Sequence, residues 1–154
     1  MELFRATSID ELKRIAREAR RNIIKMVTQA QAGHPGGALS CVDILVGLYF
    51  EVMRVDPTNP RWEDRDRLVL SKGHASVALY AVLAERGFFP KEELVTFDHI
   101  NSRLQGHVDM LKTPGVDMST GSLGQGLSAA VGMALGGKLG SKGFRVYAIL
   151  GDGE

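Results

Sequence analysis

The fold is constrained most by two short apolar segments, each of which runs directly into a glycine-rich polar turn. Residues 67–71 lead into Lys-Gly-His at 72–74, and residues 144–150 lead into Gly-Asp-Gly-Glu at 151–154. Helical periodicity surrounds them, at 8–31, 40–53, 75–86, 90–97 and 123–139. Helices that alternate with buried strands are typical of an α/β fold with a parallel sheet and flanking helices. Ligands of such sheets bind at the carboxyl ends of the strands, where both polar turns would lie.

Local signals set the boundaries of several predicted elements. Ser8 and Glu11 form a capping box at the start of the first helix, which has to end before the proline and paired glycines at 33–37. Ser40 is expected to cap the second helix. Residues 61–67 carry charges of both signs and are expected to be solvated. Residues 98–122 have little predicted regular structure, and loops of that length in a compact domain are usually functional.

Composition excludes several classes of protein. A chain of 154 residues with 44% hydrophobic content is long enough for one core, so we expect 1–154 to be a single domain. The net charge of +1 leaves no basic stripe for a nucleic acid. The single Cys41 excludes a disulfide framework and a cysteine-based zinc cluster. Neither a signal-peptide core nor a membrane-spanning run is present, so we expect a cytoplasmic protein that binds no membrane.

Three of the four histidines, His34, His74 and His107, directly follow a glycine. Glycine allows a ligand to approach the backbone, and the adjacent imidazole supplies a directional donor or a proton carrier. We therefore expect these three histidines to belong to one functional site, whereas each alone would be explained by its place in a turn. His99 lacks the pattern and is expected to be an ordinary surface residue.

The same histidines allow a zinc site on composition alone. None of them has a further ligand two to five residues away, so their spacing does not support zinc. A serine nucleophile has even less support, because no Gly-x-Ser-x-Gly turn follows a predicted strand.

The glycine-rich segment at 120–126 leads into the predicted helix at 123–139. The backbone N–H groups and the positive helix end there suit a diphosphate or another polar group. Residues 124–129 also fit Gly-x-Gly-x-x-Ala, and Asp152 follows the next strand, so a nicotinamide-binding Rossmann domain of an oxidoreductase is the alternative. Residues 117–120 do not form a buried strand, which that alternative requires. The later glycines, from Gly132 to Gly140, are expected to permit close helix packing.

Asp152 stands between two glycines at the end of a predicted strand. A carboxylate in such a turn is a suitable ligand for magnesium or calcium. Aspartate before glycine is also common in turns that bind nothing, so both interpretations stay open.

Five motifs in order along the chain resemble one family. They are His-Pro-Gly-Gly at 34–37, Leu-Ser-Lys-Gly-His at 70–74, Gly-His at 106–107, Thr-Gly-Ser-Leu-Gly-Gln-Gly at 120–126 and Gly-Asp-Gly-Glu at 151–154. Together they resemble the thiamine diphosphate domain of transketolase over essentially the whole chain, in the form of split enzymes whose N-terminal subunit is a separate chain. The resemblance implies a thiamine-diphosphate-binding α/β fold and transfer of a two-carbon ketol unit from a ketose phosphate to an aldose phosphate, as in the pentose phosphate pathway.

The resemblance also implies roles for individual residues. His74 would contact the cofactor diphosphate, Gly153 would lie against it, and Asp152 would bind Mg²⁺ or Ca²⁺. Further cofactor contacts would come from Gly121, Ser122 and Leu123. The catalytic residues would be His34 and His107, which would face the sugar hydroxyls and the reacting carbonyl. Val108 follows His107 where the family usually has a proline, and the loss of its fixed φ would loosen this histidine.

Partners follow from the same resemblance. The glutamate that activates the cofactor would lie in a pyrimidine-binding domain on a C-terminal transketolase subunit, in a dimer or heterotetramer. Further metal ligands would lie downstream of residue 154. We therefore expect a partial diphosphate-binding domain, incomplete at its C-terminus, that has little activity alone. A truncated, non-catalytic interaction module is a further alternative.

Overall fold

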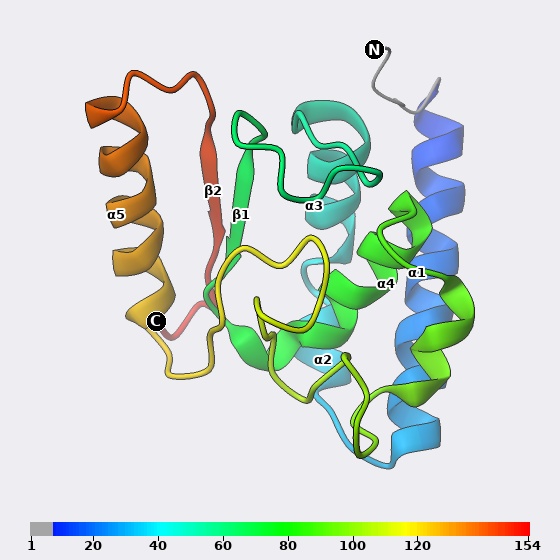
Figure 1. Ribbon diagram of the computed structural model, residues 1–154. Coiled ribbons are helices and arrows are strands. Elements are labelled where there is room, and N and C mark those ends of the chain that lie inside the picture. Colours follow the sequence, from blue (N-terminus) through cyan, green and yellow to red (C-terminus); the bar gives the residue numbers. More distant parts are fainter. Residues whose placement is uncertain (1–7) are drawn as a thin grey trace.

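Two parallel strands, β1 (Arg67–Leu70) and β2 (Val146–Ile149), lie at the centre of the computed structural model, which describes residues 8–154 (Figure 1). Arg67 pairs with Val146, and the register runs on to Leu70 and Ile149. In Figure 1, α5 (Gln125–Leu139) stands on one side of the sheet, and α3 (Val42–Gly47), α4 (Ser76–Arg86) and α1 (Ile9–Ala30) stand on the other. The predicted α/β fold with a parallel sheet and flanking helices is confirmed. The segment at 1–7, part of the stretch in which no signal-peptide core was found, lies outside the described residues.

Shorter helices complete the chain between these elements. They are α2 (Pro35–Leu39), the π-helix η1 (Leu48–Val52), and the 3₁₀ helices η2 (Gly73–Ala75) and η3 (Lys91–Thr96). Residues 97–124 contain neither a helix nor a strand, in agreement with the irregular segment predicted at 98–122. No helix within residues 8–154 combines the length and the apolar character that a membrane crossing requires.

The amphipathic pattern of α1 determines how it packs. The Ser8 hydroxyl accepts a hydrogen bond from the Glu11 N–H at 3.2 Å, so the predicted cap forms. The inward face is buried and consists of Ile15, Ala16, Ala19, Ile23 and Met26. Ile9 was expected on this face but is 70% exposed, because it lies in the first turn, outside the packed part of the helix.

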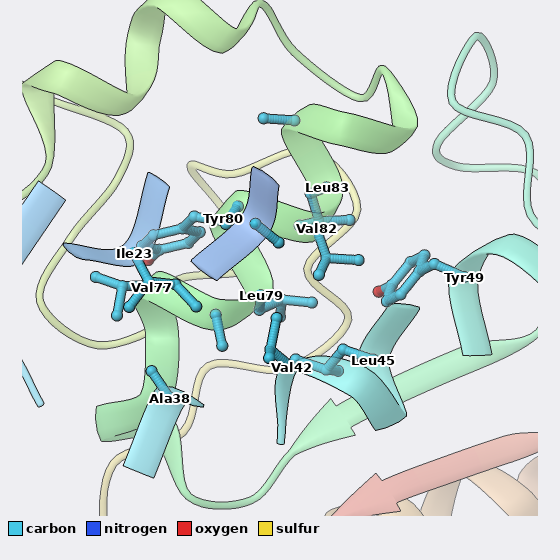
Figure 2. Packing of buried hydrophobic residues seen from close by; sticks show 14 of the residues in the cluster. Ile23, Ala38, Val42, Leu45, Tyr49, Val77, Leu79, Tyr80, Val82 and Leu83 are labelled. Atoms are coloured by element: carbon cyan, nitrogen blue, oxygen red, sulfur yellow. The ribbon is translucent and has the colours of Figure 1, made fainter. Parts of the chain in front are cut away.

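The hydrophobic core lies where α1, α2, α3 and α4 meet, and not between the sheet and α5 (Figure 2). Figure 2 shows Ile23 of α1, Val42 and Leu45 of α3, and Tyr80 and Leu83 of α4 pointing toward one another. Burial of one such side chain contributes roughly 1.5–3 kcal/mol. This packing holds α4, and with it the residues just before α4, in a fixed position relative to α2.

The segment from 33 to 53 departs from its prediction in three ways. Proline and the paired glycines were expected only to end α1, but Pro35 begins the short helix α2. Proline is tolerated there because the first turn of a helix needs no N–H partner. The continuous helix expected over 40–53 is divided into α3 and the π-helix η1. Ser40 does not cap it: its hydroxyl donates to the Gly37 carbonyl at 2.8 Å, and Cys41 stands at the N-cap instead.

The charged stretch at 61–67 is not fully solvated, contrary to its prediction. Arg65 is buried and forms an ion pair with Asp117. Asp66 is also buried, and its carboxylate accepts the backbone N–H groups of Arg54 and Arg145, each at 2.8 Å. The partners of both residues lie far away in sequence, so the local charge pattern did not reveal them.

Candidate functional site

The carboxyl ends of both strands lie at one edge of the sheet, drawn at the bottom in Figure 1, because the strands are parallel. β1 continues through Ser71 and Lys72 into η2 and α4, and β2 continues into the turn at 151–154. The short α2 packs against η2 and α4 at this edge. The long loop also returns here, since Gly73 lies directly against Thr120. Segments that carry four of the five sequence motifs therefore adjoin the end of β1.

This edge brings His34, His74 and His107 together. The ring centroids lie 5.2 Å apart for His34 and His74, and 6.5 Å apart for His34 and His107. His34 precedes α2, His74 lies in η2, and His107 lies in the loop at 97–124. His99 is exposed, as expected for a surface residue. The glycine–histidine pairs thus identified residues that three separate segments bring to one place.

Burial lowers the pKa of His74 below its usual value of 6.5. His34, Lys72 and His107 lie nearby and shift this pKa in the same direction. Glu154 shifts it the other way, with a smaller effect. His74 is therefore a neutral imidazole at pH 7, with one ring N–H to donate and one ring nitrogen to accept.

No group of three histidine, cysteine or carboxylate side chains between residues 8 and 154 is arranged to hold a metal ion. The structure therefore does not support zinc bound by the three histidines. Asp152 lies exposed in the turn after β2, where it offers a single carboxylate. Magnesium is commonly held by one or two carboxylates together with phosphate oxygens, so the turn fits a metal that a phosphorylated ligand helps to bind.

Two glycines of the site are required by close packing of the protein against itself. A Cβ at Gly73 would lie 2.3 Å from the Thr120 carbonyl oxygen. A Cβ at Gly126 would lie 2.6 Å from the Ser71 Cα. Because a real Cβ cannot approach so closely, both glycines hold the loop and α5 against the end of β1.

Other glycines leave the backbone open. No atom lies within 4 Å of the position that a Cβ would take at Gly36, Gly124 or Gly153. Gly124 also has a φ of 82°, in the left-handed region that favours glycine, where it begins α5. The backbone is therefore accessible to a ligand at these three positions.

The glycines expected to pack α5 closely divide into two groups. A Cβ at Gly137 would lie 2.7 Å from the ring of Phe144, so this glycine does permit close packing. No atom lies within 4 Å of a Cβ at Gly132 or Gly136, and both residues are exposed. Within residues 8–154, nothing packs against Gly132 or Gly136.

Three hydroxyl groups that sequence reasoning missed attach the loop to β1 and α4. The Thr120 hydroxyl donates to the Leu70 carbonyl at the end of β1. The Ser76 hydroxyl donates to the Gly106 carbonyl at 2.8 Å, and the Tyr80 hydroxyl donates to the Gln105 carbonyl at 2.9 Å. The bonds from Ser76 and Tyr80 hold the backbone just before His107, although Val108 replaces the proline usual in the family after it. Val108 is itself buried, and so anchors the loop.

A cavity of about 270 Å³ lies at the start of α5. Its walls are the residues at 118–122 together with Gln125 and Gly126. Gly121 and Ser122 thus line the cavity, whereas Leu123 does not and is 52% exposed. A larger cavity of about 620 Å³ is lined by none of the histidines. Its walls are residues 110–117 together with Pro60, Arg61, Arg65, Arg67 and Met133.

Lys72 is a further residue of this edge that the sequence did not single out. Its side chain is buried, and its ammonium group donates to the Gly37 carbonyl at 3.1 Å and to the Ser40 hydroxyl at 3.0 Å. A lysine between a predicted buried strand and a glycine was the available signal. Its burial depends on α2, which the sequence did not predict.

The residues at this edge fit an anionic cofactor group. The donors are the neutral His74, the Lys72 ammonium and the positive end of α5. In addition, the Ser71 hydroxyl is fully buried beside Gly126 and has no hydrogen-bond partner among the described residues. A diphosphate offers acceptor oxygens of the kind that such donors require.

The family is decided by comparison with known sequences. The sequence model described as "Transketolase, thiamine diphosphate binding domain" matches residues 12–153. This chain belongs to that family. The resemblance seen in the five motifs is thereby confirmed.

Individual relatives agree with the family. The chain is 49% identical over 144 residues to the "6-deoxy-6-sulfo-D-fructose transketolase subunit SqwG" of Clostridium sp. (strain MSTE9), covering 94% of this chain and 52% of the relative. It is 41% identical over 146 residues to one subunit of the apulose-4-phosphate transketolase of Phocaeicola vulgatus, covering 95% of this chain and 52% of the relative. The chain therefore spans about half the length of these curated relatives.

Solved structures show the same fold. Transketolase from Campylobacter jejuni superimposes with a TM-score of 0.89 at 37% identity, over 96% of this chain and 24% of that one. The nicotinamide-binding alternative is excluded by the family and by the fold, since residues 117–120 form no strand ahead of α5.

Proposed function

We propose that the complete polypeptide containing this chain catalyses the thiamine-diphosphate-dependent transfer of a two-carbon ketol unit from a ketose phosphate to an aldose phosphate. The observation that carries this proposal is the convergence of His34, His74 and His107 at the strand edge of a chain that belongs to this family. When bound, the cofactor supplies the electron sink for breaking and forming the carbon–carbon bond. The chain contributes one part of the diphosphate-binding domain.

His74 and the glycine-rich turn would hold the cofactor diphosphate. The neutral His74 donates one ring N–H to a diphosphate oxygen, and the open backbone of Gly153 allows the diphosphate to approach. Asp152 binds Mg²⁺ or Ca²⁺ together with diphosphate oxygens. Gly121 and Ser122 line the cavity at the start of α5 and would contact the cofactor there. Leu123 lies outside that cavity and would contact the cofactor from its exposed side.

His34 and His107 are the proposed catalytic residues. Both are exposed while His74 is half-buried, so the two outer rings are the ones that a sugar can reach. They hydrogen-bond the sugar hydroxyls and move a proton at the oxygen of the reacting carbonyl. The buried attachment of the backbone beside His107 to Ser76 and Tyr80 keeps that ring in place.

The sugar is proposed at the level of class. The curated relatives are named for a sulfonated fructose and for apulose 4-phosphate, so the family accepts anionic ketoses beyond the pentose phosphate pathway. Both relatives are named as subunits, which supports a second subunit that carries the pyrimidine-binding domain. The proposed assembly is a dimer or heterotetramer of such chains.

The test uses the complete polypeptide together with its second subunit. We expect thiamine diphosphate to bind in the presence of Mg²⁺ by calorimetry, and mass spectrometry to detect ketol transfer from a panel of phosphorylated and sulfonated ketoses. His34→Ala should lower kcat/KM by roughly 100-fold or more, as expected for loss of a general acid–base group. His99→Ala is the matched control and should leave the rate unchanged. Absence of thiamine diphosphate binding by the assembled protein would overturn the proposal.

A further inference from the structure

The buried Lys72 side chain connects three motifs that the sequence separates. Its Nζ donates to the Gly37 carbonyl at 3.1 Å and to the Ser40 hydroxyl at 3.0 Å, so it reaches the segment that follows His34. A Cβ at Gly151 would lie 4.0 Å from both the Cβ and the Cδ of Lys72, so its stem passes the turn at 151–153. Lys72 itself follows β1 and stands two residues before His74.

The bond to Gly37 has a consequence for His74. A Cβ at Gly37 would lie 3.2 Å from His74 Nε2, so the backbone of Gly37 is packed against the ring nitrogen that faces it. Because Lys72 holds the carbonyl of the same residue, it sets the distance between the Gly37–Ser40 turn and His74. The side chain therefore acts on the site through the turn that it holds.

The charge of Lys72 is not balanced within the described residues. The side chain is 7% exposed, and the groups in contact with its ammonium, the Gly37 carbonyl, the Ser40 hydroxyl and the Cys41 thiol, carry no negative charge. No carboxylate of residues 8–154 lies within ion-pair distance of its ammonium group. A buried ammonium without a counter-charge is costly, and an ammonium group has three N–H donors. An anion beside this group would be stabilised by it.

We propose that Lys72 is a positioning residue of the thiamine diphosphate site, where it ties the Gly37–Ser40 turn to the end of β1 and supplies an uncompensated positive charge beside the 151–153 turn. The inference rests on the proposed function, because it takes the anion at this edge to be the cofactor diphosphate. It adds a residue and a physical role: the protein itself provides a cation that attracts a diphosphate before any metal neutralises it.

The test measures binding of inorganic pyrophosphate and of thiamine diphosphate, each with Mg²⁺, by calorimetry on the complete polypeptide with its second subunit. Lys72→Met removes both the charge and the hydrogen bonds at similar side-chain length. Lys72→Gln removes the charge but retains an amide donor for the Gly37 carbonyl. The matched control is Lys25→Met, which neutralises an exposed lysine on α1.

Both Lys72 variants should bind pyrophosphate and thiamine diphosphate roughly 10- to 100-fold more weakly, the range expected for loss of a charged hydrogen-bonding group. The KM for the sugar at saturating cofactor should stay within about twofold of the wild-type value, since Lys72 acts on the anion site. Lys25→Met should leave both affinities unchanged.

A folded Lys72 variant that binds pyrophosphate as tightly as the wild type would overturn the inference. If Lys72→Met does not fold, Lys72→Gln decides, because it can maintain the turn. A wild-type protein that binds neither probe would overturn the proposed function as well. If the wild type binds both probes tightly and Lys72→Gln binds them equally tightly, the role of the charge is overturned. The proposed function is not affected by that result.

Discussion

His74 is held in its neutral form by its own surroundings. Burial and the neighbouring Lys72 lower the pKa of its imidazole, so the ring does not carry a charge that would compete with the metal for the diphosphate. The ring must then act as a directional donor. Its effect should therefore be felt in cofactor affinity more than in the choice of sugar.

We predict that His74→Ala weakens thiamine diphosphate binding roughly 10- to 100-fold, because a hydrogen bond to a charged oxygen is lost. The ratio of kcat/KM between two ketose phosphates should change by less than about threefold, since the ring does not read the sugar. Calorimetry and paired kinetics measure the two effects. His99→Ala, in the same loop as His107, should change neither, and a larger effect on sugar discrimination than on cofactor affinity would contradict the assigned role.

At the residue scale, what the sequence revealed depended on how local the signal was. The glycine–histidine pairs are neighbours in sequence, so His34, His74 and His107 stand out from the sequence alone. Lys72 gave a weaker signal, because its burial arises from α2 and from the turn after β2. Long-range burial of a charged group cannot be predicted from its immediate neighbours.

At the scale of elements, α5 carries glycines that serve different purposes. Gly137 packs against the Phe144 ring, at the junction between α5 and β2. Gly132 lies on the exposed side of the helix, with no atom within 4 Å of a Cβ position. Two substitutions in one helix should therefore have opposite effects.

We predict that Gly137→Ala lowers the free energy of unfolding by about 1–3 kcal/mol, because the added methyl group would overlap the Phe144 ring. Gly132→Ala should raise it by up to about 1 kcal/mol, because alanine is the better helix former. Urea denaturation followed by circular dichroism measures both variants. A loss of stability in Gly132→Ala would contradict the open surface seen on this side of α5.

Which elements could be predicted depended on whether one pattern extended over the whole element. α1 has both a cap and a continuous apolar stripe, and β1 is a short apolar segment bounded by charges and glycine, so both were predicted nearly to the residue. The helix expected over 40–53 contains the same kind of apolar pattern, yet a π-helix interrupts it. Arg65 and Asp117 form a buried ion pair between the segment before β1 and the long loop, and no local pattern indicates this.

At the scale of the whole molecule, the site is a meeting point of segments rather than a pocket within one element. Its residues come from the start of α2, from the end of β1, from the long loop and from the turn after β2. Most of the core lies away from the site, where α1, α2, α3 and α4 meet. A ligand that contacts all of these segments should therefore stabilise parts of the chain that the core does not hold together.

We predict that thiamine diphosphate with Mg²⁺, at 100 times its Kd, stabilises the complete protein by about 2.7 kcal/mol. For a domain of 150–250 residues such a gain raises Tm by roughly 5–10 °C, and a larger protein shows a smaller increase. EDTA should abolish most of the increase in Tm, because EDTA removes the metal. We expect that metal to be bound by Asp152 and to hold the diphosphate at the turn. Asp152→Asn should reproduce the effect of EDTA, and unphosphorylated thiamine should give no increase. Scanning calorimetry measures these changes in Tm. If the increase in Tm is as large in the presence of EDTA, the diphosphate is held without a divalent ion, and the role assigned to Asp152 is wrong.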